Sequence, residues 1–171
     1  MSLPGAAIDR GGVWIPVARR ALVRGMRAFT VSELAIAFAI LAILLAMAVP
    51  SYQSYRQQVN VAVATRDIGQ IYSRIESYIA LHHNPPPNLA AVGEDQVLDP
   101  WGRPYVYLSF QSLNAKGQTR KDKNLAPINT QFDLYSSGAD GRSVPPLTAK
   151  VSQDDVILAK DGAYIGLASS Y

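Results

Sequence analysis

The sequence contains no cysteine, and this absence excludes several kinds of chemistry at once. Without cysteine there is no disulfide to stabilise an exported domain, no thiol nucleophile and no thiolate-bound zinc or iron–sulfur site. A chain of 171 residues is nevertheless long enough to bury a hydrophobic core without cross-links. The folded part of the chain is therefore expected to hold together by packing.

Charged residues are also scarce, at 17%, whereas hydrophobic residues make up 49%. This balance predicts a membrane segment, and one lies between Phe29 and Val49, where Glu33 is the single charged residue. About 20 apolar residues are enough to cross a bilayer as a helix. No later stretch of the sequence matches this one.

The basic residues are unevenly spread. Residues 1–28 contain five arginines and one aspartate, which leaves 11 of the 16 basic and 12 of the 13 acidic residues for the rest of the chain. Positive charge ahead of an apolar run keeps the N-terminus in the cytoplasm and sends the C-terminal region across the membrane. Because the rest of the chain is nearly neutral and lacks clustered lysine and arginine, no nucleic-acid partner is expected.

The order of apolar residues predicts an α+β fold. A helix is expected from residue 29 to about 82, apolar on all sides at first and amphipathic from about residue 61, and the prolines at 85–87 end it. Short strands are expected at 105–108, 132–135, 156–158 and 163–165, and residues 111–124 are expected to form an exposed loop. The predicted architecture is a long N-terminal helix packed on a small antiparallel sheet.

The start of the apolar run holds the most informative residues. An ionised carboxylate inside hydrocarbon is costly, so Glu33 needs a partner. A cut between Ala28 and Phe29 would create an α-amino group four residues before Glu33. That ammonium and the carboxylate would neutralise each other, within one subunit or between neighbours in a bundle of helices.

The segment from Arg27 to Pro50 resembles the cleavage and methylation segment of prepilins, the precursors of type IV pilin-like proteins. In that family prepilin peptidase cuts before the phenylalanine and methylates the new amino group, and the family prefers glycine where this chain has Ala28. The resemblance implies cleavage before Phe29, N-methylation of Phe29, and roles in assembly for Glu33 and for the helix-bending Pro50. It further implies a type IV pilin-like fold, with a basic leader at 1–28, a transmembrane and assembly helix at 29–49 and a periplasmic globular domain at 50–171, which includes the C-terminal half of the helix.

Two later motifs narrow the resemblance. Asp-Pro-Trp-Gly-Arg-Pro-Tyr at 99–105 and Ser-Ser-Gly-Ala-Asp-Gly at 136–141 are similar to segments of the major, G-type pseudopilin of type II secretion systems. This resemblance implies a subunit of a helical homopolymer, the pseudopilus, held first in the bacterial inner membrane. Its implied partners are the minor pseudopilins, prepilin peptidase and an inner-membrane assembly platform.

The same resemblance implies one Ca²⁺ ion in the loop after residue 136. Calcium takes six to eight oxygen ligands from carboxylates, carbonyls and water. The predicted ligands are the carboxylates of Asp140, Asp154 and Asp155 and the carbonyl of Ser137. The alternative is an uncoordinated surface turn, since Gly-Ala-Asp-Gly is a good turn sequence by itself.

Other interpretations stay open. The apolar run also suits a plain membrane anchor, or a signal peptide cut after Ala46-Met47-Ala48. Two alternative functions are a major or minor subunit of a surface type IV pilus and a membrane-anchored periplasmic binding domain that never polymerises. The sequence has no P-loop, no G-x-S-x-G and no H-E-x-x-H motif, so no enzyme and no catalytic residue is expected.

Overall fold

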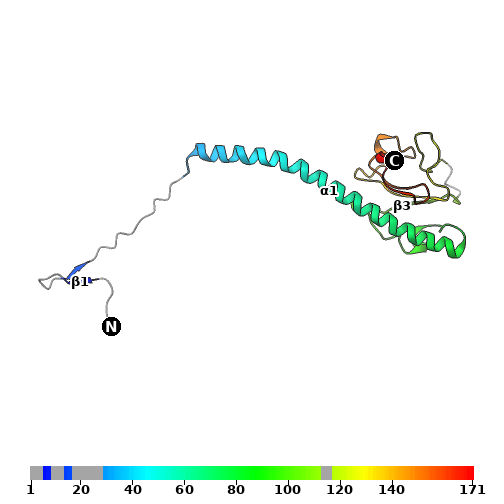
Figure 1. The fold of residues 1–171 in the computed structure, drawn as a ribbon, viewed down its shortest axis with the longest axis horizontal. Coiled ribbons are helices and arrows are strands. Elements are labelled where there is room, and N and C mark those ends of the chain that lie inside the picture. Colours follow the sequence, from blue (N-terminus) through cyan, green and yellow to red (C-terminus); the bar gives the residue numbers. More distant parts are fainter. Residues whose placement is uncertain (1–5, 9–13, 17–28, 113–116) are drawn as a thin grey trace. The chain divides into compact units, whose positions relative to one another are not determined.

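The computed structural model describes residues 6–8, 14–16, 29–112 and 117–171, and it divides into two compact units, Met1–Leu44 and Leu45–Tyr171 (Figure 1). The first unit holds two short antiparallel strands, β1 (Ala6–Ile8) and β2 (Trp14–Pro16), and the beginning of the helix α1. The sequence pattern did not predict these two strands. The second unit holds the remainder of α1 and all further strands.

Helix α1 spans Val31–His82, which confirms the predicted long helix. It runs through Pro50. At its C-terminal end His83 has a φ of 58°, a left-handed conformation that stops the helix, and three prolines follow at 85–87. The helix therefore ends where the proline cluster begins, as expected.

Four strands form one antiparallel sheet in the order β3 (Val106–Ser109), β4 (Phe132–Ser136), β5 (Val156–Ala159) and β6 (Tyr164–Leu167). Each strand lies within two residues of its predicted position. The runs of β-branched and aromatic residues account for this agreement, because such side chains fit a pleated surface. A 3₁₀ turn, η1 (Leu89–Val92), connects the helix to the sheet region, and the side chain of Asn88 caps it.

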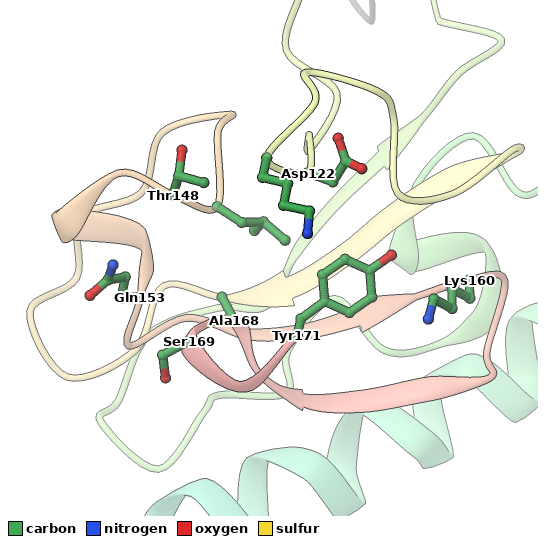
Figure 2. Close-up of a pocket in the computed structure, with 9 residues that line it drawn as sticks. Asp122, Thr148, Gln153, Lys160, Ala168, Ser169 and Tyr171 are labelled. Atoms are coloured by element: carbon green, nitrogen blue, oxygen red, sulfur yellow. The ribbon is translucent and has the colours of Figure 1, made fainter.

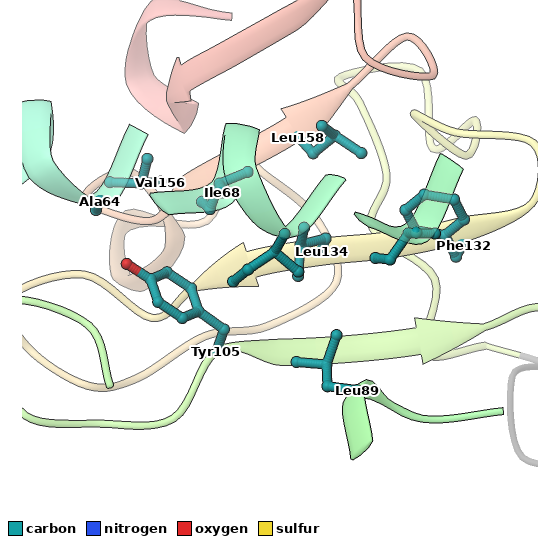
Figure 3. Packing of buried hydrophobic residues seen from close by; sticks show 10 residues of the cluster. Ala64, Ile68, Leu89, Tyr105, Phe132, Leu134, Val156 and Leu158 are labelled. Carbon is teal, nitrogen blue, oxygen red and sulfur yellow. The ribbon is translucent and has the colours of Figure 1, made fainter. Parts of the chain in front are cut away.

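The main core lies between α1 and the sheet. The buried helix residues Ala64, Ile68, Ile71 and Ile75 recur every three or four positions, and they face buried residues of β4 and β5 (Figure 3). These strand residues are Phe132, Leu134, Val156 and Leu158. Each fully buried aliphatic side chain of this kind contributes about 1.5–3 kcal/mol. The predicted amphipathic stripe of α1 is thus its packing face.

A second cluster is built on Ile157 and Ala159 of β5, with buried residues of the loops and the C-terminal turn, namely Ile128, Leu147 and Ala168. The expectation that residues 111–124 form an exposed loop is wrong for Arg120, whose residue surface is 1% exposed. A charged side chain is buried here because acidic and carbonyl partners surround it, and those partners are described below.

Candidate functional site

The N-terminal part of α1 is exposed along its whole length. Every residue from 29 to 56 is exposed, including Phe29 at 85%. The helix is long and apolar enough at this end to cross a membrane. An exposed apolar surface of this size is typical of a segment that contacts a membrane or another protein. Ala28, the residue before the predicted cut, lies outside the described residues.

Glu33 and Thr30 fix the start of α1 by reciprocal hydrogen bonds. The backbone N–H and the hydroxyl of Thr30 donate to Oε2 of Glu33 over 2.9 Å and 2.8 Å, and the N–H of Glu33 donates to Oγ1 of Thr30 over 3.2 Å. This is a capping box, which satisfies N–H groups left free in the first helical turn. The Thr-x-x-Glu spacing was the available signal, and the sequence interpretation missed it. Pairing of Glu33 with the amino group of Phe29 stays a prediction.

Pro50 occupies an interior position of α1, where it has no N–H to donate to the preceding turn. The hydroxyl of Ser51 donates to the carbonyl of Met47 over 3.2 Å, and that of Ser54 donates to the carbonyl of Ser51 over 2.9 Å. Hydroxyls next to the proline therefore satisfy backbone carbonyls in this part of the helix. The assembly role of Pro50 stays a prediction.

Asp99 organises the first of the two later motifs. Its Oδ1 accepts hydrogen bonds from the backbone N–H groups of Trp101 and Arg103, over 3.0 Å and 2.8 Å. Its Oδ2 accepts from the hydroxyl of Ser136, at the end of β4, over 2.5 Å. Asp99 is itself buried. The sequence indicated only a turn here. An aspartate at the start of a turn commonly accepts hydrogen bonds from the backbone N–H groups of that turn, so this role of Asp99 could have been predicted.

The loop that follows β4 depends on two glycines. Gly138 and Gly141 have φ values of 63° and 70°, which favour residues without a Cβ. The guanidinium of Arg103 donates to the carbonyl of Gly138, and a Cβ at Gly141 would lie 2.6 Å from Nη1 of Arg103. The motifs at 99–105 and 136–141 are therefore in direct contact, because the Arg103 side chain packs against the glycine loop.

Comparison with known proteins then shows the family. The chain is 31% identical over 140 residues to type II secretion system core protein G of Pseudomonas aeruginosa, covering 70% of this chain and 87% of that protein. The chain belongs to the core protein G family. Its long helix on a four-stranded antiparallel sheet confirms the predicted α+β, pilin-like fold. No family model matches the chain, and no solved structure matches it.

This member of the core protein G family brings together only part of the predicted calcium ligands. The N–H of Asp140 donates to Oδ2 of Asp154 over 3.0 Å, so those two residues are neighbours. The carbonyl of Ser137 accepts from the N–H of Gly141 over 3.1 Å. In residues 29–112 and 117–171, no three histidine or acidic side chains gather into a metal-binding group.

Of the four predicted calcium ligands, Asp155 is the one whose side chain lies away from the glycine loop. It is fully buried, and its Oδ2 accepts from the guanidinium of Arg120 and, over 2.7 Å, from the hydroxyl of Ser143. Asp154 lies in a turn beside the glycine loop, whereas Asp155, directly before β5, is buried in the interior. The predicted set including Asp155 does not fit a calcium ion in this arrangement, and calcium bound by the remaining residues stays a prediction.

Burial raises the pKa of Asp155 to about 6, although Ser143 and Arg120 both favour its charged form. Burial also raises the pKa of Asp133, which accepts the backbone N–H of Arg120 over 2.6 Å. These two carboxylates and the arginine form a buried charged group that the sequence interpretation did not foresee.

The sheet also carries a pocket of about 420 Å³ beside the last residues of the chain (Figure 2). Tyr171 and Lys160 line it, with the lysine nitrogen 5.2 Å from the centre of the tyrosine ring. Thr148, Gln153 and Ser169 add polar groups to its lining. No nucleophile paired with a base is present among these lining residues, so the pocket gives no indication of catalysis.

Proposed function

We propose that this chain is a structural subunit of a pseudopilus, the helical filament of a type II protein secretion system. The observation that carries the proposal is the relationship to core protein G over most of both chains. The exposed apolar half of α1 supports it, because a filament core of bundled helices gives such a surface a partner. The proposed role is structural, with no catalytic residue.

Processing is the first step of the proposal. Prepilin peptidase would remove residues 1–28 by cutting between Ala28 and Phe29, and Phe29 would receive an N-methyl group. The new ammonium would lie one helical turn before Glu33, and that proximity supports a charge pair between them. The precursor and the mature subunit would both remain in the inner membrane through residues 29–49, with residues 50–171 in the periplasm.

Assembly follows from the two kinds of surface on this chain. The apolar half of α1 would leave the lipid and enter a bundle of the same helices, while the head with its buried core would lie outside. A contact between unlike faces, repeated along a screw axis, makes a fibre rather than a closed ring. The proposed partners are further copies of this chain, the minor pseudopilins and the membrane assembly platform.

Gene replacement in the native bacterium tests the function. Deleting this chain should leave type II substrates in the periplasm, and the wild-type chain should restore their release into the medium. Glu33→Gln should fail to restore release although the protein reaches the membrane at normal levels. Normal release after deletion, with loss of surface fibres, would favour the surface pilus. Normal release with no change in fibres would favour a domain that never polymerises.

A further inference from the structure

The side chain of Arg120 ends in a ring of oxygen atoms from the loop 142–155. Its Nη1 donates to the hydroxyl of Ser143 over 2.5 Å and to the carbonyl of Val144 over 2.6 Å. Its Nη2 donates to the carboxylate of Asp155. A hydroxyl, a carbonyl and a carboxylate are the ligand types that a hard metal cation takes from proteins. Here a guanidinium lies among them.

Several contacts hold Arg120 in this place. Its guanidinium carbon lies 4.4 Å from the centre of the Tyr135 ring, a cation–π contact with β4. Its own N–H is bound to Asp133 of the same strand. The side chain is 2% exposed and that of Asp155 is 0% exposed. The arginine is therefore an interior residue fixed from both sides and not a surface side chain that swings in.

The backbone next to Arg120 fixes the loop as well. The N–H of Lys121 donates to the carbonyl of Pro145 over 2.8 Å, and the N–H of Leu147 donates to the carbonyl of Lys121 over 2.9 Å. Within the loop, Ser152 binds both the N–H and the carbonyl of Val144 over 2.9 Å. The segment that carries Arg120 thus pairs with the loop whose oxygens its guanidinium binds.

Charge explains why a cation is needed at this point. A buried carboxylate is costly unless an opposite charge and hydrogen bonds offset the loss of water. Arg120 supplies both to Asp155, and a metal ion brought to the same oxygens would be repelled by the guanidinium. The burial of both side chains and the contacts of the guanidinium with Ser143, Val144 and Asp155 agree with one positive charge in this ring, which Arg120 provides.

We propose that Arg120 is a built-in cation, which takes the place of a bound metal ion and keeps the loop 142–155 folded against the sheet. The inference goes beyond the filament role, because it concerns how the head domain is stabilised. The resemblance of the two motifs to pseudopilins implies that calcium holds this loop, whereas in this chain we assign that role to Arg120. The loop should therefore hold its structure in the absence of calcium.

Hydrogen exchange on the full-length wild-type chain in detergent micelles tests the proposal without any variant. With a chelator present, the amides of Lys121 and Leu147 should exchange slowly, at the same rate as in millimolar calcium. Rapid exchange in chelator that calcium suppresses would overturn the proposal, because a metal ion would then be holding the loop.

Thermal melts of the same protein give a second test at neutral pH. Arg120→Ala should lower the melting temperature by about 6 °C or more, since it leaves a buried carboxylate without its partner. The melting temperature of Arg120→Lys should lie between those of the wild type and Arg120→Ala. The control Arg142→Ala, at an exposed position in the same loop, should melt like the wild type. An unchanged melting temperature for Arg120→Ala would contradict the proposal. Neither test involves filament assembly, so both remain valid if the chain never polymerises.

Discussion

The hydroxyl of Ser136 donates a 2.5 Å hydrogen bond to the buried carboxylate of Asp99, and this bond joins the two sequence motifs that resemble pseudopilins. Asp99 closes the turn before β3, and Ser136 is the last residue of β4. The glycine loop after β4 therefore begins at a point fixed by a turn more than 30 residues earlier in the chain.

Asp99→Asn should destabilise the head domain by about 1.5–3 kcal/mol, because hydrogen bonds to a charged acceptor are worth roughly that amount. Urea unfolding followed by tryptophan fluorescence measures the change, since Trp101 lies in the same turn. The control Asp95→Asn alters an exposed aspartate nearby and should change stability little. Equal losses for both variants would show that Asp99 is not the organiser of the turn.

Ile71→Ala should cost about 2–5 kcal/mol in the free energy of unfolding, because it leaves a cavity between α1 and the sheet. Leu81→Ala is the matched control on the same helix, where the side chain is exposed and its loss should cost little. The two variants compared in the same denaturant series decide whether the predicted stripe is the packing face. Similar losses of unfolding free energy for Ile71→Ala and Leu81→Ala would contradict the assignment of the stripe as the packing face.

Glu33 has two separable properties, its charge and its capping bonds. Glu33→Gln keeps a side-chain acceptor for the capping box but removes the charge, whereas Glu33→Ala removes both. We expect both variants to insert in the membrane and both to fail in filament assembly, measured as filaments recovered from the cell envelope. Normal assembly by Glu33→Gln would show that the cap matters and that charge pairing with Phe29 does not.

The raised pKa of Asp155 makes a prediction about pH. Its ordinary value is 3.8 and its folded value is about 6, so between these values the folded chain holds a proton that the unfolded chain has lost. This group's contribution to stability is therefore fully present below about pH 4 and is lost as the pH rises to about 6. The unfolding free energy of the wild type relative to Asp155→Asn should fall across that window and stay level above it. A relative stability that rises between pH 4 and 6 would contradict the raised pKa.

The long helix and the strands were predictable because their signals are local. The apolar run, the stripe at 64–75 and the β-branched runs of β3 to β6 each lie within a few neighbouring residues. The burial of Arg120 was not predictable in this way, because its partner Asp155 lies 35 positions further along the chain. The different environments of Asp154 and Asp155 likewise depend on partners elsewhere in the chain, because Asp154 accepts from the N–H of Asp140 and Asp155 accepts from Arg120.

The capping box is a different case, because its signal was present. Thr30 and Glu33 have the Thr-x-x-Glu spacing of a capping box. The prediction considered only the free-energy cost of placing the Glu33 carboxylate in the membrane, and so it named a charge partner and no helix cap. The two functions are compatible. The capping bonds use Oε2 of Glu33, and the second oxygen remains for an ammonium group of the same or a neighbouring subunit.

Intact-mass analysis of filaments purified from the cell envelope of the native bacterium tests most directly whether this chain is the processed subunit of a pseudopilus. We expect filaments whose main component begins at Phe29, carries one N-methyl group and contains every residue to Tyr171. Fibres without this chain, or a membrane-bound chain that keeps residues 1–28 or begins after Ala48, would contradict it.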